Sequence, residues 1–64
     1  MITAGMEATH RKTQEVYKIV SVSKIKLNGT WLEDRCVTYK NEYGQLFSRI
    51  ETDFLIKFDI EYLQ

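Results

Sequence analysis

The stretch Phe54-Leu55-Ile56-Lys57-Phe58-Asp59-Ile60-Glu61-Tyr62 decides how this chain is expected to fold. Its aromatic and isoleucine residues recur at every second position, at 54, 56, 58, 60 and 62. A strand sends successive side chains to opposite faces, so the spacing predicts a terminal strand over residues 54–62 with one aromatic-rich wall. This wall must be buried against the rest of the chain or against a second copy. Because a terminal strand offers an unpaired edge to its twin, we expect a homo-oligomer.

Two turns organise the strands that precede this stretch. Asn28-Gly29 lies between two runs rich in β-branched residues and predicts a hairpin with a type I′ turn, which joins strands over residues 15–27 and 30–39. Gly44 ends a second turn, and residues 45–50 are expected to form a third strand. Residues 51–53 break the pattern, where Thr52 or Asp53 would cap a single helical turn through Phe54-Leu55, after which the last strand follows.

The two-residue turn also predicts a register. It pairs Leu27 with Thr30, places Trp31 opposite Lys26, and sets Lys24 against Glu33. Further from the turn it sets Val20 against Val37 and Lys18 against Tyr39. In this ladder the apolar residues near the turn and those near the base lie on opposite faces. We therefore expect a β-bulge or a sharp bend midway, around residues 21–23 or 34–36.

The resulting fold class is all-β. The 64 residues are enough for one small core, and 44% of them are hydrophobic. We expect a small curled antiparallel sheet or an SH3-like barrel of about four or five strands, with room for one short helical turn. Residues 10–64 form this single domain in our interpretation. Residues 1–9 have no apolar periodicity and are expected to form a flexible N-terminal arm, with docking of Ile2 and Met6 on the body as the alternative.

Composition narrows the function classes. Nine basic residues balance nine acidic ones, which disfavours a general nucleic-acid binder because phosphate neutralisation supplies most of such affinity. Cys36 is the only cysteine and His10 the only histidine, so the sequence predicts no internal disulfide and no metal site. No apolar run approaches the ~20 residues that span a bilayer. The first residues do not resemble a signal peptide, and we expect a cytoplasmic protein with no membrane partner.

Several short motifs resemble the DUF1653-like family of small bacterial and phage proteins. They are His10 with Lys12-Thr13, a Tyr17-centred strand, Val37-Thr38-Tyr39, Gly44, the run 46–49 that ends in Arg49, and Phe54 with Phe58. The chain departs from the family at Thr9, where Arg is usual, at Phe47, where Trp is usual, and at Ile50, where Pro is usual. The resemblance covers roughly residues 9–58 and implies a compact β fold and a bacterial or phage origin. The family carries no assigned activity, and whether His10 and Arg49 share a site is left open.

Basic and aromatic side chains supply the candidate binding residues, which are His10, Arg11, Tyr17, Trp31, Arg35, Tyr39, Phe47 and Arg49. If the cations among them, together with Lys12 and Lys18, converge beside Tyr17, Tyr39 or Phe47, they form the cation-plus-stacking surface that holds bases and phosphates. The opposing interpretation is a solvated face on which Arg49 is tied to Glu51 or Asp53. Trp31, near the hairpin turn, is either a lid on the core or an exposed anchor for a partner.

These observations favour a non-enzymatic binding module that interacts with a host protein or a small ligand and inhibits a host function. The first alternative is a nucleotide or nucleic-acid binder that uses the basic and aromatic residues. A weaker alternative is a small enzyme that uses His10, with Cys36 read as a small buried hydrophobe rather than a nucleophile. We assign no catalytic, cofactor-binding or metal-binding residues, and no cofactor.

Overall fold

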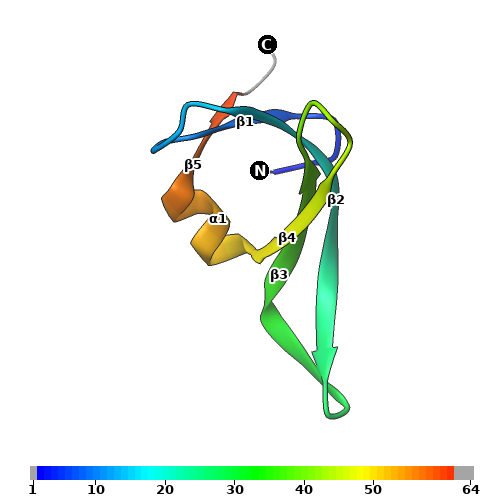
Figure 1. Ribbon diagram of the computed structural model, residues 1–64. Coiled ribbons are helices and arrows are strands. Elements are labelled where there is room, and N and C mark those ends of the chain that lie inside the picture. Colours follow the sequence, from blue (N-terminus) through cyan, green and yellow to red (C-terminus); the bar gives the residue numbers. More distant parts are fainter. Residues whose placement is uncertain (1, 62–64) are drawn as a thin grey trace.

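A single five-stranded antiparallel sheet and one short helix make up the computed structural model, which describes residues 2–61 (Figure 1). The elements in chain order are β1 (Glu7–His10), β2 (Val16–Leu27), β3 (Thr30–Lys40), β4 (Leu46–Ile50), α1 (Glu51–Lys57) and β5 (Phe58–Glu61). The strand order across the sheet is β4-β3-β2-β1-β5. The predicted small curled antiparallel sheet with a short helical turn is confirmed, and the sheet is not closed into a barrel.

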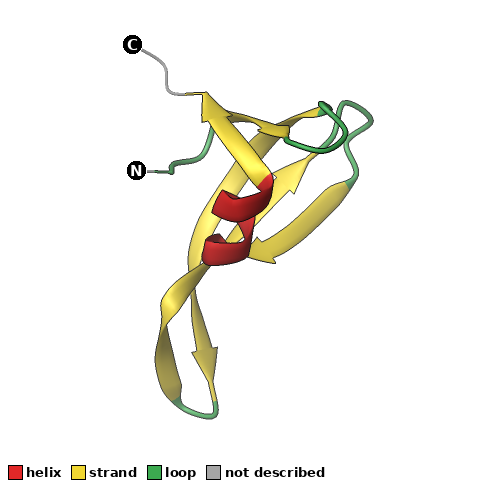
Figure 2. Cartoon of the chain, turned by 90° about the vertical axis from the view of Figure 1, so that its left-hand side faces the viewer, coloured by secondary structure: helices red, strands yellow, loops and turns green. Residues whose placement is uncertain are grey.

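Helix α1 joins the two edge strands of this sheet. β4 ends at Ile50 and α1 begins at Glu51, while β5 begins directly after Lys57. The sheet curls so that α1 lies across the gap between its edges, in contact with β3, β4 and β5 (Figures 1 and 2). The concave side of the sheet and the helix together enclose the core.

Seven residues are buried in this core: Ile2, Ala8, Ile19, Val37, Tyr39, Phe54 and Phe58. Phe54 and Phe58 stack with ring centroids 4.2 Å apart, and Tyr39 packs against each of them at 5.1 Å. Aromatic pairs at these separations add about 0.5–1.5 kcal/mol each beyond area burial. Of the aromatic wall predicted from the C-terminal stretch, Phe54 and Phe58 are therefore buried, within one chain.

The backbone that carries this wall differs from the prediction. Residues 51–57 are helical, so the predicted helical turn is present but longer than expected, and the strand predicted over 54–62 begins only at Phe58. Phe58 follows the last helical residue, one turn beyond Phe54, and both are buried on the inner side, whereas Ile56 lies on another side of the helix and is 61% exposed. The N-cap is Ile50, without a side-chain cap, rather than Thr52 or Asp53. Tyr62 lies outside the described residues.

The N-terminal segment also differs from the prediction. Residues 7–9, assigned to a flexible arm from the sequence, belong to β1, which pairs with both β2 and β5. Ahead of it, the Gly5 N–H donates to the Ile19 carbonyl and the Ile19 N–H donates to the Met6 carbonyl, both at 2.8 Å. Ile2 and Ala8 are buried as a consequence. Burial of only two small apolar side chains leaves no periodic pattern in the sequence.

The β2–β3 hairpin follows the predicted register only near its turn. Asn28 and Gly29 both have positive φ, and Leu27 pairs with Thr30 and Lys26 with Trp31 as expected. A register shift then follows between Lys24 and Lys26, so Lys24 faces Arg35 rather than Glu33. The predicted irregularity midway along the hairpin is confirmed, although it lies one or two residues closer to the turn than expected. Beyond it, residues 25–34, here called the distal hairpin, project away from the body (Figure 1).

A second register shift lies between Ile19 and Ser21 of β2. Because of the two shifts, Val22 rather than Val20 faces Val37, and Lys18 faces Lys40 rather than Tyr39. An extra residue in one strand reverses which side chains point inward. Ile19 is therefore buried and Val20 is exposed, the reverse of the expectation from the sequence.

Candidate functional site

Arg49 of β4 links three elements of the body. Its Nε donates to Tyr39 Oη on β3 at 2.8 Å, and its Nη1 donates to Asp53 Oδ2 on α1 at 2.6 Å. The guanidinium carbon also lies 5.7 Å from the centre of the Phe58 ring. The hydrogen bond to Asp53, and then that to Tyr39, raises the pKa of Arg49. The predicted tie between Arg49 and Asp53 is therefore present, and Arg49 holds α1 against the sheet.

Three of the four predicted aromatic residues, Tyr17, Tyr39 and Phe47, form one cluster that reaches Arg49 through Tyr39. Tyr17 makes edge contacts with Tyr39, Phe47 and Phe58 at centroid separations of 5.4, 6.0 and 5.5 Å. Phe47 stacks on Tyr39 with centroids 5.6 Å apart and is 40% exposed. Burial, followed by the nearby carboxylate of Glu15, raises the pKa of the Tyr17 phenol. Because these rings cover one another, the cluster stabilises the core rather than presenting open ring faces for bases to stack on.

Arg35 does not join this group. Its Nε and Nη2 donate to the two carboxylate oxygens of Glu51 at 2.9 and 2.6 Å, a bidentate pair. The pair raises the pKa of Arg35 and lowers that of Glu51. Next to it, Asp34 accepts hydrogen bonds from the Thr52 hydroxyl at 2.7 Å and the Thr52 N–H at 3.3 Å. Arg35 and Arg49 do not converge on one face, because Arg35 fastens the start of α1 to β3.

His10 ends β1 and is held in a fixed orientation. Its Nδ1 accepts hydrogen bonds from the N–H groups of Lys12 and Thr13, each at 3.3 Å, and its ring meets the Phe58 ring edge-on at 5.0 Å. Cys36 lies on β3, and β2 separates that strand from β1. Two strand spacings amount to about 9–10 Å. The two residues do not form a nucleophile–base pair.

His10 and Arg49 nevertheless line one cavity, which answers the question that the family resemblance raised. The cavity has a volume of about 370 Å³ and lies between the β1–β2 turn, β4 and the C-terminal end of α1. Its lining residues are His10, Arg11, Lys12, Arg49, Ile56 and Lys57, and we call it the basic cavity. Arg11 is paired with Asp59 at 3.0 Å, on the exposed rim.

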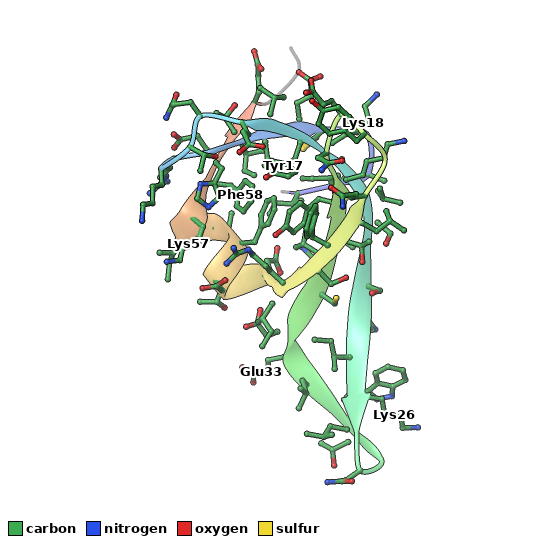
Figure 3. The ribbon with its side chains drawn as sticks, viewed as in Figure 1. Tyr17, Lys18, Lys26, Glu33, Lys57 and Phe58 are labelled. Carbon is green, nitrogen blue, oxygen red and sulfur yellow. The ribbon has the colours of Figure 1, made fainter. Side chains whose placement is uncertain are left out.

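Trp31 is far from all of these residues in the fold, on the distal hairpin. It is 59% exposed, with the Lys26 ammonium 5.1 Å from the centre of its ring. Trp31 pairs with Lys26 across the hairpin, so both lie on one face, and alternation places Leu27 and Leu32 on the other. Both leucines are exposed. Figure 3 shows Lys26 and Glu33 on this extension, well below the aromatic core that contains Tyr17 and Phe58. Trp31 is an exposed residue and not a lid on the core.

Sequence reasoning missed several residues of these two regions. Ile56 and Lys57 of the basic cavity were not among the candidate binding residues, and neither were Leu27 and Leu32 of the distal hairpin, whereas Lys12 was placed on the basic face and in the family motif. The predicted terminal strand would have placed Lys57 on its charged face. Lys57 is instead the last residue of α1, where it lines the basic cavity. The run His10-Arg11-Lys12 was the one signal in the sequence for the cavity, as three adjacent nitrogen-bearing side chains at a turn.

Residues 2–61 show neither a metal cluster nor a membrane-spanning helix. Residues 2–61 contain no group of three or more His, Cys, Asp or Glu side chains placed to hold a metal ion. In the same range no helix is long and apolar enough to cross a bilayer. No family model matches the chain, and searches of curated proteins and of solved structures also found no match.

Proposed function

We propose that this protein is a non-enzymatic binding module that inserts its distal hairpin into an apolar groove of a protein partner. The single observation that carries the proposal is the exposure of Trp31, Leu27 and Leu32 on a two-stranded projection. Exposed tryptophan is the residue type most often found to dominate the energy of a protein interface. An isolated hairpin gains little stability from holding such side chains in water.

Charge favours a protein partner over nucleic acid at this position. The distal hairpin, residues 25–34, carries one lysine, Lys26, and two carboxylates, Glu33 and Asp34, for a net charge of −1. A segment with no excess of positive charge releases few counterions from a phosphate backbone, so it gains little of the electrostatic affinity on which nucleic-acid binding depends.

The shape of the distal hairpin favours a different protein over a second copy. Apolar side chains lie on both faces of the distal hairpin. A groove that encloses the hairpin would cover both faces, whereas a second copy packed against it would cover only one face. The described part of β5, where we expected self-pairing, is four residues long and carries Asp59 and Glu61. Short, charged edge strands resist pairing.

The contribution of Trp31 to binding follows from its exposure. A tryptophan side chain buries about 150–250 Å² when fully covered. With 59% of Trp31 exposed, about 90–150 Å² is left for a partner to cover. At ~25 cal/mol per Å² this is about 2–4 kcal/mol, or between about 30-fold and several hundred-fold in Kd.

The experiment places a photo-crosslinking amino acid at position 30, beside Trp31, in cells that make the protein, with the same group at the exposed position 43 as control. We expect one heterologous adduct from position 30, lost on adding Trp31→Ala, and no such adduct from position 43. The purified pair should then show the loss of affinity calculated above for Trp31→Ala. An adduct of twice the chain mass would identify a second copy as the occupant. Equal labelling from both positions, or unchanged affinity in Trp31→Ala, would reject the hairpin as the docking element.

A further inference from the structure

The basic cavity carries positive charge that the chain does not neutralise. Four side chains around it are cationic: Arg11, Lys12, Arg49 and Lys57. Two of them are paired with carboxylates, Arg11 with Asp59 and Arg49 with Asp53. Lys12 and Lys57 form no ion pair within residues 2–61. Four cations less two carboxylates leave a local charge of +2 in a chain whose net charge is zero.

Another cavity of similar size shows that this charge is not a general property of the surface. A cavity of about 300 Å³ beside β1 and β5 is lined by Gly5, Glu7, Lys18 and Glu61, with two carboxylates against one ammonium. Lys57 has a structural role of its own, because its positive charge lies at the negative, C-terminal end of the α1 dipole. No such reason applies to Lys12, which lies in the β1–β2 turn.

His10 supplies a hydrogen-bond donor to the same cavity. Its Nδ1 accepts two backbone N–H groups, so in the neutral ring the proton resides on Nε2. Nε2 makes no hydrogen bond within residues 2–61, and no buried side-chain nitrogen or oxygen there lacks a partner. Nε2 is therefore reachable by solvent or by a ligand. The edge contact with Phe58 fixes the ring plane.

We infer that the basic cavity binds a small phosphomonoester. A phosphoryl group carries about −1.5 to −2 charges at pH 7, which matches the uncompensated charge of +2 better than a carboxylate does. Lys12 and Lys57 would approach its oxygens as point charges, and His10 Nε2–H would donate to a third position. Ile56, 61% exposed at the rim, offers an apolar contact for the organic part of the ester. This inference does not depend on the distal hairpin.

The test is a titration of the isotope-labelled protein, followed by amide and imidazole NMR signals at constant ionic strength. Phenyl phosphate, inorganic phosphate and a single-stranded oligothymidine are the probes. We expect saturable shifts at Lys12, Thr13 and the His10 ring, with millimolar affinity for phenyl phosphate and weaker binding of inorganic phosphate. The double variant Lys12→Gln/Lys57→Gln should bind phenyl phosphate roughly tenfold more weakly, since it loses two exposed ionic contacts.

A matched variant separates a site from general charge. Lys24→Gln/Lys40→Gln removes the same charge from exposed strand positions and should leave the affinity unchanged. Melting temperatures of both double variants should lie close to that of the parent, because none of the four lysines forms an ion pair within residues 2–61. Shifts that stay linear with phenyl phosphate, or an equal loss of affinity in the control variant, would overturn the inference. Tighter binding of oligothymidine through the same residues would also overturn it, in favour of a polynucleotide.

Discussion

Phe54 and Ile56 distinguish a helical from an extended backbone at residues 54–57. On an extended chain their side chains share one face, and truncating either would open the core. On α1 they point in different directions, with Phe54 0% exposed and Ile56 61% exposed. Truncating a buried phenylalanine costs about 3–5 kcal/mol. For a domain of 64 residues the whole free energy of unfolding is about 3–10 kcal/mol, so Phe54→Ala should leave the protein close to unfolded.

Ile56→Ala is the matched control on the same helix. It removes a side chain that is mostly in water and replaces a β-branched residue by the best helix former, so its free energy of unfolding should change by less than about 0.5 kcal/mol. Phe54→Leu keeps most of the volume and should cost about 1 kcal/mol, which keeps the comparison measurable if Phe54→Ala does not fold.

The assay is urea and thermal unfolding followed by far-UV circular dichroism. For a domain of this size about 1 kcal/mol shifts the Tm by roughly 4–8 °C. We expect a Tm loss of several degrees for Phe54→Leu, a much larger loss for Phe54→Ala, and almost none for Ile56→Ala. If Ile56→Ala were as damaging as Phe54→Ala, both side chains would face the interior, and the helical assignment of residues 51–57 would be refuted.

Three further perturbations test the packing. The hydrogen bond from Arg35 lowers the pKa of Glu51 from its usual value of 4.5, so this pair stabilises the fold fully above pH 4.5 and less as the pH falls through the folded pKa. Glu51→Gln removes this contribution, so the Tm of the variant should fall less steeply with acid than that of the parent. Tm measurements from about pH 6 to 2 will test this. Gly29→Ala places a Cβ at φ +79° in the hairpin turn and should cost about 1 kcal/mol by urea unfolding, and no loss would contradict the type I′ geometry. In Arg49→Lys the single ammonium replaces the planar guanidinium that bonds both Tyr39 and Asp53, so the free energy of unfolding should fall by about 1–3 kcal/mol. An unchanged urea midpoint would mean that Arg49 does not fasten α1.

The sequence predicted what depends on local pattern. The Asn28-Gly29 turn set the first pairs of the hairpin, and the conflict between the apolar residues on either side of it indicated that the register must shift. The inward aromatic set at Phe54 and Phe58 was also correct. Residues separated by four are in phase for both a strand of period two and a helix of period 3.6, so these two positions cannot distinguish the structures.

The remaining errors arise where distant residues decide the outcome. Ile56 is in phase only with a strand, and its exposure followed from the attachment of α1 to β3 through Arg35-Glu51 and Asp34-Thr52. Those contacts join residues 16 and 18 positions apart, and no local pattern announces them. The basic cavity is similar, because its side chains come from β1, the following turn, β4 and α1. Of the cations proposed for one binding face, Arg11, Lys12 and Arg49 meet there, and Lys18 and Arg35 do not.

The register shifts between β2 and β3 separate the distal hairpin from the core. The shift nearer the turn lies between Lys24 and Lys26 of β2, opposite residues 31–35 of β3. Every buried core residue precedes Lys24 or follows Arg35, so residues 25–34 contribute no side chain to the core. Lengthening that segment by one residue in each strand, or replacing its apolar tip, would leave Val37, Tyr39 and Phe58 undisturbed. The ten positions of this segment can therefore be substituted while the rest of the chain keeps its fold.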